Sequence, residues 1–189
     1  MKVSAILLAA GLSLRMGGQD KLLLEYRGST LLARSVALMD SLPVCEKILV
    51  TTPERLKRLE LPNSIQAVIN PHPETGQSGS MRLGLEAASG EYYFFMAADQ
   101  PLLEAGDIKP VLDAAENGKI AYPTVNGSPC TPVLFSSVFR GELLAQSGDC
   151  GGRLVREAHP QSCRAVEAGR PERFVDIDSI EDFYSWCGV

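Results

Sequence analysis

Apolar and polar positions alternate along this chain in blocks that predict strands and helices in turn. Continuous apolar runs are typical of strands buried in a parallel sheet, and they occupy Val3–Ala10, Lys47–Thr51, Gln66–Asn70, Tyr92–Ala97 and Lys119–Tyr122. Apolar residues at helical spacing predict helices between them, over Thr30–Ser41, Pro53–Leu59, Ser78–Ala88 and Glu104–Glu116. This order predicts an α/β fold with a mostly parallel sheet and helices on both of its faces.

The C-terminal third has a less regular pattern. Residues 123–132 are rich in Gly, Pro, Ser and Thr, which predicts either an ordinary connection or a substrate loop. From Ser136 to Val189 we expect two or three more helices and short strands, with a last helix at Ile180–Trp186. No stretch has the composition of a linker between domains, so residues 1–189 are expected to form a single domain.

Composition narrows the classes of function. The net charge of −5 argues against a general nucleic-acid-binding protein, which would show a basic face. The five cysteines form no CxxC pair and lie at no zinc spacing from either histidine, which favours reduced, mostly structural thiols. No segment approaches a membrane span, and the N-terminus runs into the first strand without a cleavage site. We therefore expect a cytoplasmic protein without a membrane partner.

The loop after the first strand has the composition of a phosphate site. The strand stops at Gly11 and is followed by a glycine-rich segment that holds Arg15 and Lys21. Glycines let backbone N–H groups approach an anion, and the two cations add charge. The common phosphate motifs do not fit, because Lys21 precedes Leu22 rather than Ser or Thr, and Ser13 replaces a glycine of the dinucleotide fingerprint. The alternative is an ordinary strand-to-helix turn with exposed basic residues.

Carboxylates are placed where a metal ion would be useful. Asp99 is the first charge after the apolar strand Tyr92–Ala97, at the end of a strand where α/β proteins bind ligands, although it is also suited to cap the next helix. Asp176 and Asp178 would share one face of a strand, and paired carboxylates repel unless a cation lies between them. In one interpretation, one or both of these aspartates complete a metal site with Asp99. In the other, Asp178 or Ser179 caps the last helix.

A second polar cluster, Gly76-Gln77-Ser78-Gly79-Ser80, precedes a predicted helix. Its N–H groups and hydroxyls are suited to read the edge of a base or to bind a sugar. Capping alone would explain one serine, whereas this cluster contains two serines and two glycines. Arg82, two residues further on, is expected to face solvent.

These motifs together resemble a known family. LAAG, then Arg-Met-Gly-Gly, then Asp-Lys closely resembles the signature loop of the nucleotidyltransferases with a Rossmann-like fold. Among these, the chain is most similar to the molybdenum cofactor cytidylyltransferases, which are relatives of the molybdenum cofactor guanylyltransferases. The resemblance recurs in order along the chain, in GQSGSMRLGLEAA, FFMAADQPLL, SPCTPVLF, SGDCGGRLV and DIDSIEDF. It implies a single-domain Rossmann-like three-layer αβα sandwich.

The resemblance also implies a reaction and its residues. The reaction is the transfer of CMP from CTP to the phosphate of the molybdenum–pterin cofactor, with release of pyrophosphate and with a client molybdoenzyme as a further partner. Arg15 and Lys21 would be catalytic, and Asp99 with Asp178 or Asp176 would bind Mg²⁺. The nucleotide would be bound by Leu8, Ala9, Ala10, Gly11, Gly17, Gly18, Gly76 and Ser80.

The sequence departs from the family where the acceptor would bind. Cys130-Thr131-Pro132 stands in place of the usual Gly-His-Pro, and the loss of a titratable ring leaves the acceptor open. Arg153 would bind the acceptor's phosphate or pair with a neighbouring acid. Guanylyl transfer to the same acceptor is one alternative, although Ala10, where the guanine users carry a glycine, favours a pyrimidine. Cytidylyl or uridylyl transfer to a sugar or polyol phosphate and non-catalytic delivery of a cofactor are the others.

Overall fold

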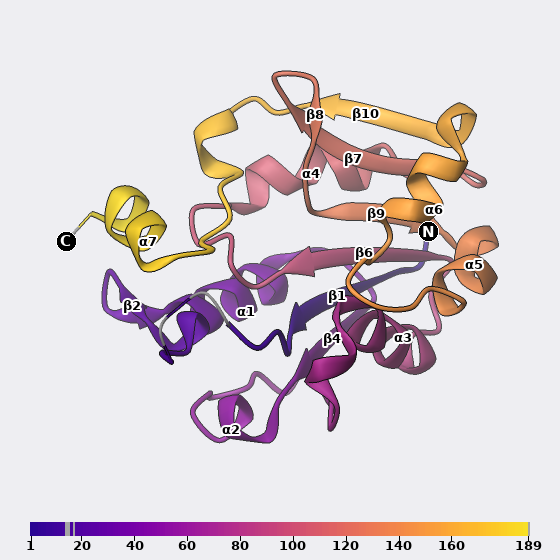
Figure 1. The fold of residues 1–189 in the computed structure, drawn as a ribbon. Helices are drawn as coiled ribbons and strands as arrows, with labels where there is room; N and C mark the ends of the chain where they lie inside the picture. The colour runs from indigo at the N-terminus through magenta and orange to yellow at the C-terminus, as the bar shows by residue number, and fades with distance from the viewer. Residues whose placement is uncertain (14–15, 17, 189) are drawn as a thin grey trace.

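A large β-sheet organises the chain in a computed structural model that describes residues 1–13, 16 and 18–188. The strand order is β10-β7-β9-β6-β1-β4-β5, and β8 pairs with the C-terminal end of β7 (Figure 1). These strands are β1 (Val3–Ala9), β4 (Glu46–Thr51), β5 (Gln66–Ile69), β6 (Tyr92–Ala97), β7 (Ile120–Val125), β8 (Ser128–Pro129), β9 (Val133–Ser136) and β10 (Cys163–Glu167). A small separate hairpin consists of β2 (Glu25–Tyr26) and β3 (Ser29–Thr30).

The centre of the sheet is parallel. β1 lies between β4 and β6 and runs parallel to both, so that Ile6 is opposite Ile48 on one side and Phe95 on the other. β9 is inserted antiparallel between β6 and β7. The predicted mostly parallel sheet is confirmed, and the carboxyl ends of β1, β4, β5 and β6 meet at one edge.

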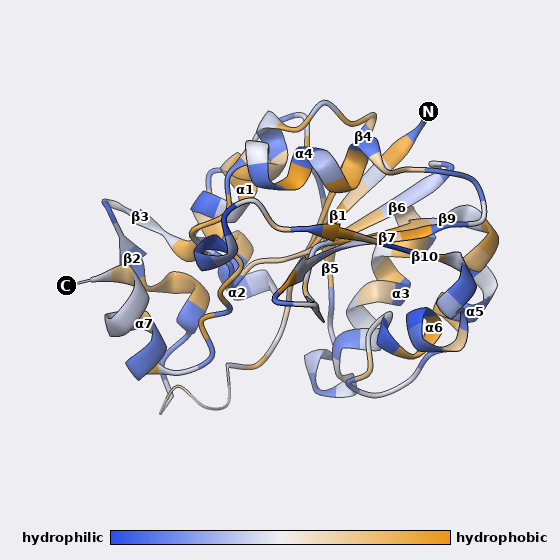
Figure 2. Ribbon diagram, turned by 90° about the horizontal axis from the view of Figure 1, so that it is seen from above, coloured by the Kyte–Doolittle hydropathy of each residue, from blue (hydrophilic) through white to orange (hydrophobic). Residues whose placement is uncertain are grey.

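Helices cover both faces of the sheet, as predicted (Figure 2). They are α1 (Leu31–Ser41), α2 (Pro53–Leu56), α3 (Gln77–Ala87), α4 (Ala105–Asp113), α5 (Arg140–Leu144), α6 (Arg153–Ala158) and α7 (Ile180–Cys187). Apolar residues of α1 and α4 pack on one face, where Leu7 of β1 points. Residues of α3, α5 and α6 pack on the other face, together with Ile6. The alternation of side chains along β1 therefore supplies two cores from one strand.

Several predicted boundaries are wrong by a few residues. α2 ends at Leu56 rather than Leu59, and α4 spans Ala105–Asp113 rather than 104–116. Glu104 is the N-cap of α4, with its N–H donating to the Asp107 carboxylate at 2.9 Å. The strand predicted at 119–122 continues to Val125, because it pairs with β10.

The strand that would have placed Asp176 and Asp178 on one face is wrong. Residues 174–178 are irregular, and the Ile177 N–H donates instead to the carbonyl oxygen of Asp99 at 2.9 Å. Ser179 caps α7 by accepting the Asp182 N–H at 3.1 Å. None of the helices that the structure describes combines the length and the apolar character needed to cross a bilayer.

Candidate functional site

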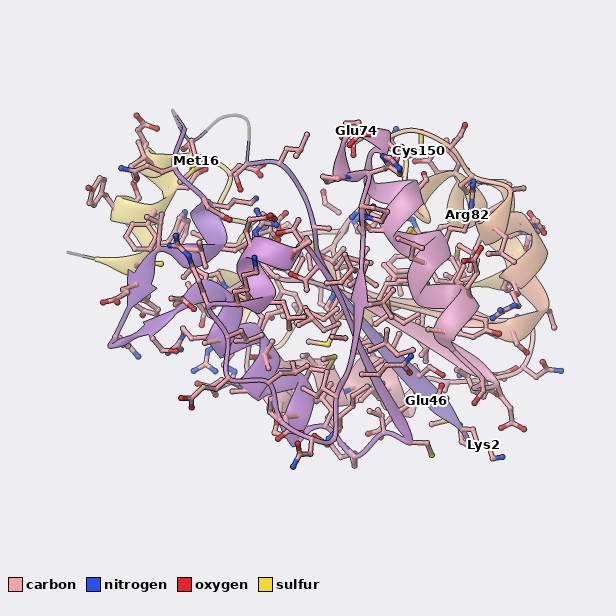
Figure 3. All side chains as sticks on the ribbon, turned by 90° about the horizontal axis from the view of Figure 1, so that it is seen from below. Lys2, Met16, Glu46, Glu74, Arg82 and Cys150 are labelled. Carbon is pink, nitrogen blue, oxygen red and sulfur yellow. The ribbon has the colours of Figure 1, made fainter. Side chains whose placement is uncertain are left out.

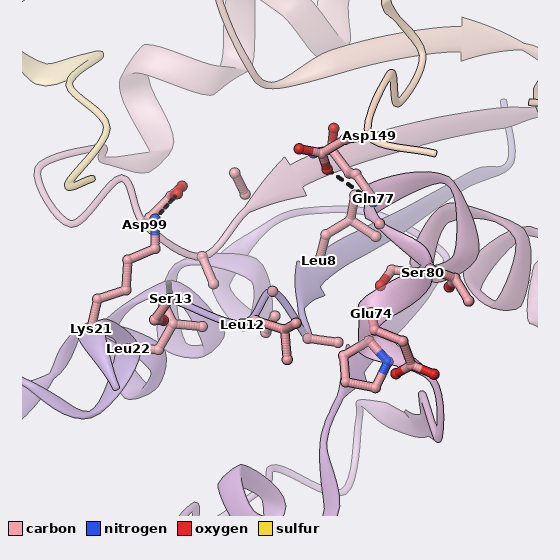
Figure 4. A pocket seen from close by; sticks show the side chains of 18 of the residues that line it. Leu8, Leu12, Ser13, Lys21, Leu22, Glu74, Gln77, Ser80, Asp99 and Asp149 are labelled. Atoms are coloured by element: carbon pink, nitrogen blue, oxygen red, sulfur yellow. Dashed lines mark hydrogen bonds and ion pairs between the residues drawn. The ribbon is translucent and has the colours of Figure 1, made fainter. Parts of the chain in front are cut away.

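A cleft of about 590 Å³ lies at the carboxyl edge of the sheet (Figure 4). Its walls come from the end of β1 and the following loop, from the segment before α3, and from the end of β6. The predicted site residues that line it are Leu8, Ala9, Ala10, Gly11, Lys21, Gly76, Ser80, Asp99 and Asp178. Gly18 and Asp176 are not among its lining residues. Arg15 and Gly17 lie outside the described residues, so the roles expected of them stay predictions.

Lys21 is held between two carboxylates. It begins the short 3-10 helix η1 (Lys21–Leu23), which Asp20 caps by accepting the Leu22 N–H at 3.1 Å. The Lys21 ammonium donates to Asp99 Oδ2 at 2.6 Å and to Asp178 Oδ1 at 3.3 Å (Figure 4 shows the first contact). Burial alone would lower the pKa of Lys21, but the two carboxylates outweigh it and the pKa is raised. Lys21 is therefore a cation at neutral pH.

The end of β6 carries a concentrated negative charge. Asp99 does not cap the following helix, because that position belongs to Glu104, so one alternative for it is removed. Desolvation of Asp176 by the surrounding segments disfavours its charged form. Together with repulsion from the negative charges of Asp99 and Asp178, this raises the pKa of Asp176 to about 6. The hydrogen bond between Ile177 and Asp99 brings this C-terminal segment to the sheet edge.

The residues around Asp99 have the chemistry of a magnesium site but are not arranged as a ready one. Among the described residues no group of three His, Cys, Asp or Glu is placed to hold a metal ion, and the Lys21 ammonium lies between Asp99 and Asp178. The other oxygen of Asp99, Oδ1, is buried without a hydrogen-bond partner in the described chain. A buried, unpaired carboxylate oxygen is the kind of ligand that Mg²⁺ takes. The donor set therefore fits the ion, and metal binding remains a prediction.

Two loops close the opposite wall of the cleft. Gly76 has φ +85°, and a Cβ placed there would lie 2.7 Å from the carbonyl group of Gly148, so only glycine fits. The Gln77 N–H donates to Asp149 Oδ1 at 3.2 Å (Figure 4), and the Ser78 N–H donates to the Gly148 carbonyl at 3.1 Å. The predicted polar cluster before α3 is thus joined to a segment far along the chain.

Ser80 has a buried partner that the sequence did not reveal. Asn70, which follows β5, is 2% exposed, and its Nδ2 donates to the Ser80 Oγ at 3.0 Å. The carbonyl oxygen of the same amide accepts the His72 N–H at 2.9 Å, which fixes the amide orientation. Because the Ser80 oxygen accepts this hydrogen bond, its hydroxyl hydrogen points away from Asn70. The only signal in the sequence was a polar residue at the end of a predicted strand.

Arg55 was also missed. It lies in α2, where the charged residues of PERLKRL have the pattern of a solvated helix face, yet it is 4% exposed. Its Nε donates to Asp20 Oδ2 at 2.7 Å, next to Lys21 in the chain. The position of α2 directly after β4, at the carboxyl edge of the sheet, was the one available signal.

Other predicted positions are less involved. Arg82 is exposed and donates to the Gln146 carbonyl at 3.1 Å. Arg153 is exposed and pairs with Glu157 at 3.8 Å, which agrees with the prediction that it pairs with a neighbouring acid. The segment Cys130–Pro132, where the sequence departs from the family pattern, contacts the site through Gln100, whose Nε2 donates to the Thr131 carbonyl at 3.4 Å.

Comparison with known proteins agrees with this geometry. The model of the MobA-like NTP transferase domain family matches residues 5–163. The chain is 32% identical to 2-C-methyl-D-erythritol 4-phosphate cytidylyltransferase of Thermus thermophilus, over 84% of this chain and 66% of that protein. It is 34% identical to the molybdenum cofactor guanylyltransferase of Pseudomonas fluorescens, over 54% of this chain and 50% of that protein. Over almost its whole length, 96% against 95%, it is 24% identical to nicotine blue oxidoreductase of Paenarthrobacter nicotinovorans.

Solved structures show the same fold. Rv0371c of Mycobacterium tuberculosis superposes with a TM-score of 0.87 at 22% identity, over 100% of this chain and 98% of that one. A nucleotidyl transferase of Methanothermobacter thermautotroptrophicus superposes with a TM-score of 0.83 at 23% identity, over 97% and 95%. The Rossmann-like three-layer sandwich is therefore confirmed. With the family match over most of its length, the chain belongs to the MobA-like NTP transferase domain family and is an enzyme of the nucleotidyltransferase class.

Proposed function

We propose that this enzyme transfers CMP from CTP to the phosphate of a molybdenum–pterin cofactor and releases pyrophosphate. The observation that carries the proposal is the cluster of Lys21, Asp99 and Asp178 at one end of a cleft whose other end is lined by Ser80. Phosphoryl chemistry of this type needs positioning and charge neutralisation more than covalent catalysis.

In the proposed reaction an oxygen of the acceptor's phosphate attacks the α-phosphorus of CTP. The bond from the α-phosphorus to the bridging oxygen breaks, and pyrophosphate leaves with the electron pair. Asp99 and Asp178 would hold Mg²⁺, which when bound neutralises charge on phosphate oxygens. Lys21, a cation at neutral pH, neutralises charge that develops at the α-phosphate and orients the incoming phosphate. No general base is needed, because a phosphate monoester with a second pKa of about 6 is already ionised.

Base recognition is proposed at the end of the cleft formed by Ala10 and Ser80. Asn70 leaves the Ser80 hydroxyl hydrogen to donate, so the site suits a base edge that presents an acceptor, such as O2 or N3 of cytosine. The Ala10 methyl narrows the space for a purine. A site with fixed polarity discriminates because the wrong base leaves its polar groups unpaired.

The phosphorylated acceptor rests on similarity. The guanylyltransferase relatives are named for the molybdenum cofactor, while the Thermus relative is named for a methylerythritol phosphate. The chain spans about half the length of the guanylyltransferases. The segment at Cys130–Pro132 departs from the pattern expected for the pterin, so transfer to a polyol phosphate is the second candidate.

Pyrophosphate release with each nucleoside triphosphate, with and without each acceptor, tests the proposal. We expect release with CTP that depends on the molybdenum–pterin cofactor. Preference for GTP would establish the guanylyl alternative, and dependence on a polyol phosphate would establish the second candidate. Absence of pyrophosphate release under all conditions, with oxidoreductase activity on nicotine blue, would contradict the proposal and favour the chemistry named for the Paenarthrobacter relative.

A further inference from the structure

We propose that Arg55 is a positioning residue for nucleotidyl transfer: it clamps both ends of the loop after β1 and thereby sets the position of Lys21. The inference rests on the proposed function. Arg55 is not among the residues that line the cleft, so it acts through the loop and not on a substrate.

The guanidinium of Arg55 joins the two ends of the loop. At the start of the loop, Nη1 donates to the Ala9 carbonyl at 2.7 Å and Nη2 donates to the Gly11 carbonyl at 2.7 Å. At the end of the loop, Nε donates to Asp20 Oδ2 at 2.7 Å and Nη2 donates to Asp20 Oδ1 at 2.9 Å. One buried side chain therefore fixes the residues on both sides of the segment that we expect to bind the phosphates.

The contact continues from Asp20 to the catalytic lysine. Asp20 Oδ1 also accepts the Leu22 N–H at 3.1 Å and so begins the short helix η1 that carries Lys21. A change in the Asp20 carboxylate therefore shifts the backbone of Lys21, whose ammonium reaches Asp99 at 2.6 Å. A misplacement of about 1 Å at a reacting group can lower a rate by about 10²-fold.

An arginine is required by this geometry. Its planar fork donates to a carboxylate in a bidentate manner while other N–H groups reach two carbonyls, whereas a lysine ammonium is a point charge. A buried ion pair is weak evidence for stability, because apolar residues of similar volume often stabilise as well. The value of the Arg55–Asp20 pair is that it specifies one arrangement of the loop ends.

Arg55→Lys tests the clamp, with Arg140→Lys as the matched control. Arg140 is partly buried, donates to the Ala88 carbonyl at 3.4 Å and to the Tyr93 hydroxyl at 3.0 Å, and belongs to α5 away from the cleft. We expect Arg55→Lys to lower kcat at saturating CTP by about 10–100-fold with little change in the acceptor's KM, because the groups are misplaced and not removed. Arg140→Lys should lose some stability and keep kcat.

Asp20→Asn and a double variant separate positioning from general destabilisation. Asp20→Asn keeps the shape and should lower kcat in the same direction. Adding Asp20→Asn to Arg55→Lys should lower kcat little further, because the effects of substituting residues that act as one unit are not additive. If Arg55→Lys does not fold, Asp20→Asn carries the test alone. Full additivity, or a kcat equal to that of wild type in both single variants, would overturn the inference.

Hydrogen exchange at the Leu22 amide reports on the clamp without any assay of transfer. We expect faster exchange in Arg55→Lys than in wild type or in Arg140→Lys, since the Asp20 acceptor is no longer held. Faster exchange in Arg55→Lys, together with a wild-type protein that transfers no nucleotide, would support the clamp and refute the proposed function. Unchanged exchange in an active enzyme would refute the clamp and leave the function.

Discussion

Replacing Lys21 with alanine removes the one described cation that lies between Asp99 and Asp178 in the cleft. The side chain is only 15% exposed, so water does not fully replace its charge. We expect the variant to fold, because the apolar contacts of Leu22, the buried residue of η1, are untouched.

Two different losses follow from this change. Stability falls by about 1–3 kcal/mol, the usual effect of leaving a partly buried acceptor unpaired. The raised pKa of Lys21 means that this contribution is fully present at neutral pH and is lost only in alkaline solution, as the pH rises through that pKa. Transfer falls further, by about 10²–10³-fold in kcat, because a contact that grows in the transition state is lost.

Lys47→Ala is the matched control. Lys47 is 13% exposed and pairs with Asp40 at 3.4 Å, but it lies near the start of β4, beside Glu46, at the end of the molecule opposite Glu74 and the cleft (Figure 3). Denaturant unfolding should show a loss of stability in both variants, and pyrophosphate release should fall only in Lys21→Ala. Turnover of Lys21→Ala within a few-fold of wild type, or an equal loss in Lys47→Ala, would refute the reasoning.

Three further changes test other parts of the account. Asp99→Asn should abolish Mg²⁺-dependent transfer with little effect on unfolding, because an amide keeps the shape but not the charge that holds a hard cation. If the variant instead unfolds readily but stays active, the role of Asp99 is structural. Partial burial opposes ionisation of Glu46, but hydrogen bonds from Ser4 and Ser89 outweigh it and hold its pKa below the ordinary value of a glutamate. The stability that this carboxylate contributes at neutral pH is therefore lost as the pH falls through its lowered pKa, and Glu46→Gln should flatten this acid limb in denaturant titrations. Gly84→Ala would place a Cβ 2.5 Å from Cγ2 of Ile6 in β1 and should therefore lower the free energy of unfolding by about 1–3 kcal/mol. Unchanged stability would show that α3 can shift on the sheet to make room for the methyl group.

The parts of the fold that the sequence predicted are those with local causes. The apolar run Val3–Ala10 becomes β1 because it is buried on both faces, and Thr30 caps α1 by accepting the Ala33 N–H at 3.1 Å. The insertion of β9 between β6 and β7 could not be predicted, because an apolar run does not specify which strand it pairs with or in which direction. The irregular segment at 174–178 depends on one tertiary hydrogen bond, from Ile177 to Asp99.

The candidate site shows the same division. Lys21, Asp99 and Gly76 were found because each has a local signal: a loop after a strand, a charge at a strand end, or a glycine cluster before a helix. Asn70 and Arg55 act through partners on other elements of the fold, Ser80 in α3 and Asp20 at the end of the loop after β1. Their residue types fit exposed positions equally well, so only the folded chain distinguishes them.

The central claim is that the α-phosphorus of CTP is the centre that reacts. Incubating the enzyme with the molybdenum–pterin cofactor and with CTP radiolabelled on the α-phosphate tests it most directly, with Lys21→Ala as the inactive control. We expect the α-label to appear on the acceptor, and label placed on the γ-phosphate to be released as pyrophosphate. Label from the γ-phosphate on the acceptor, or α-label only as free CMP, would contradict it.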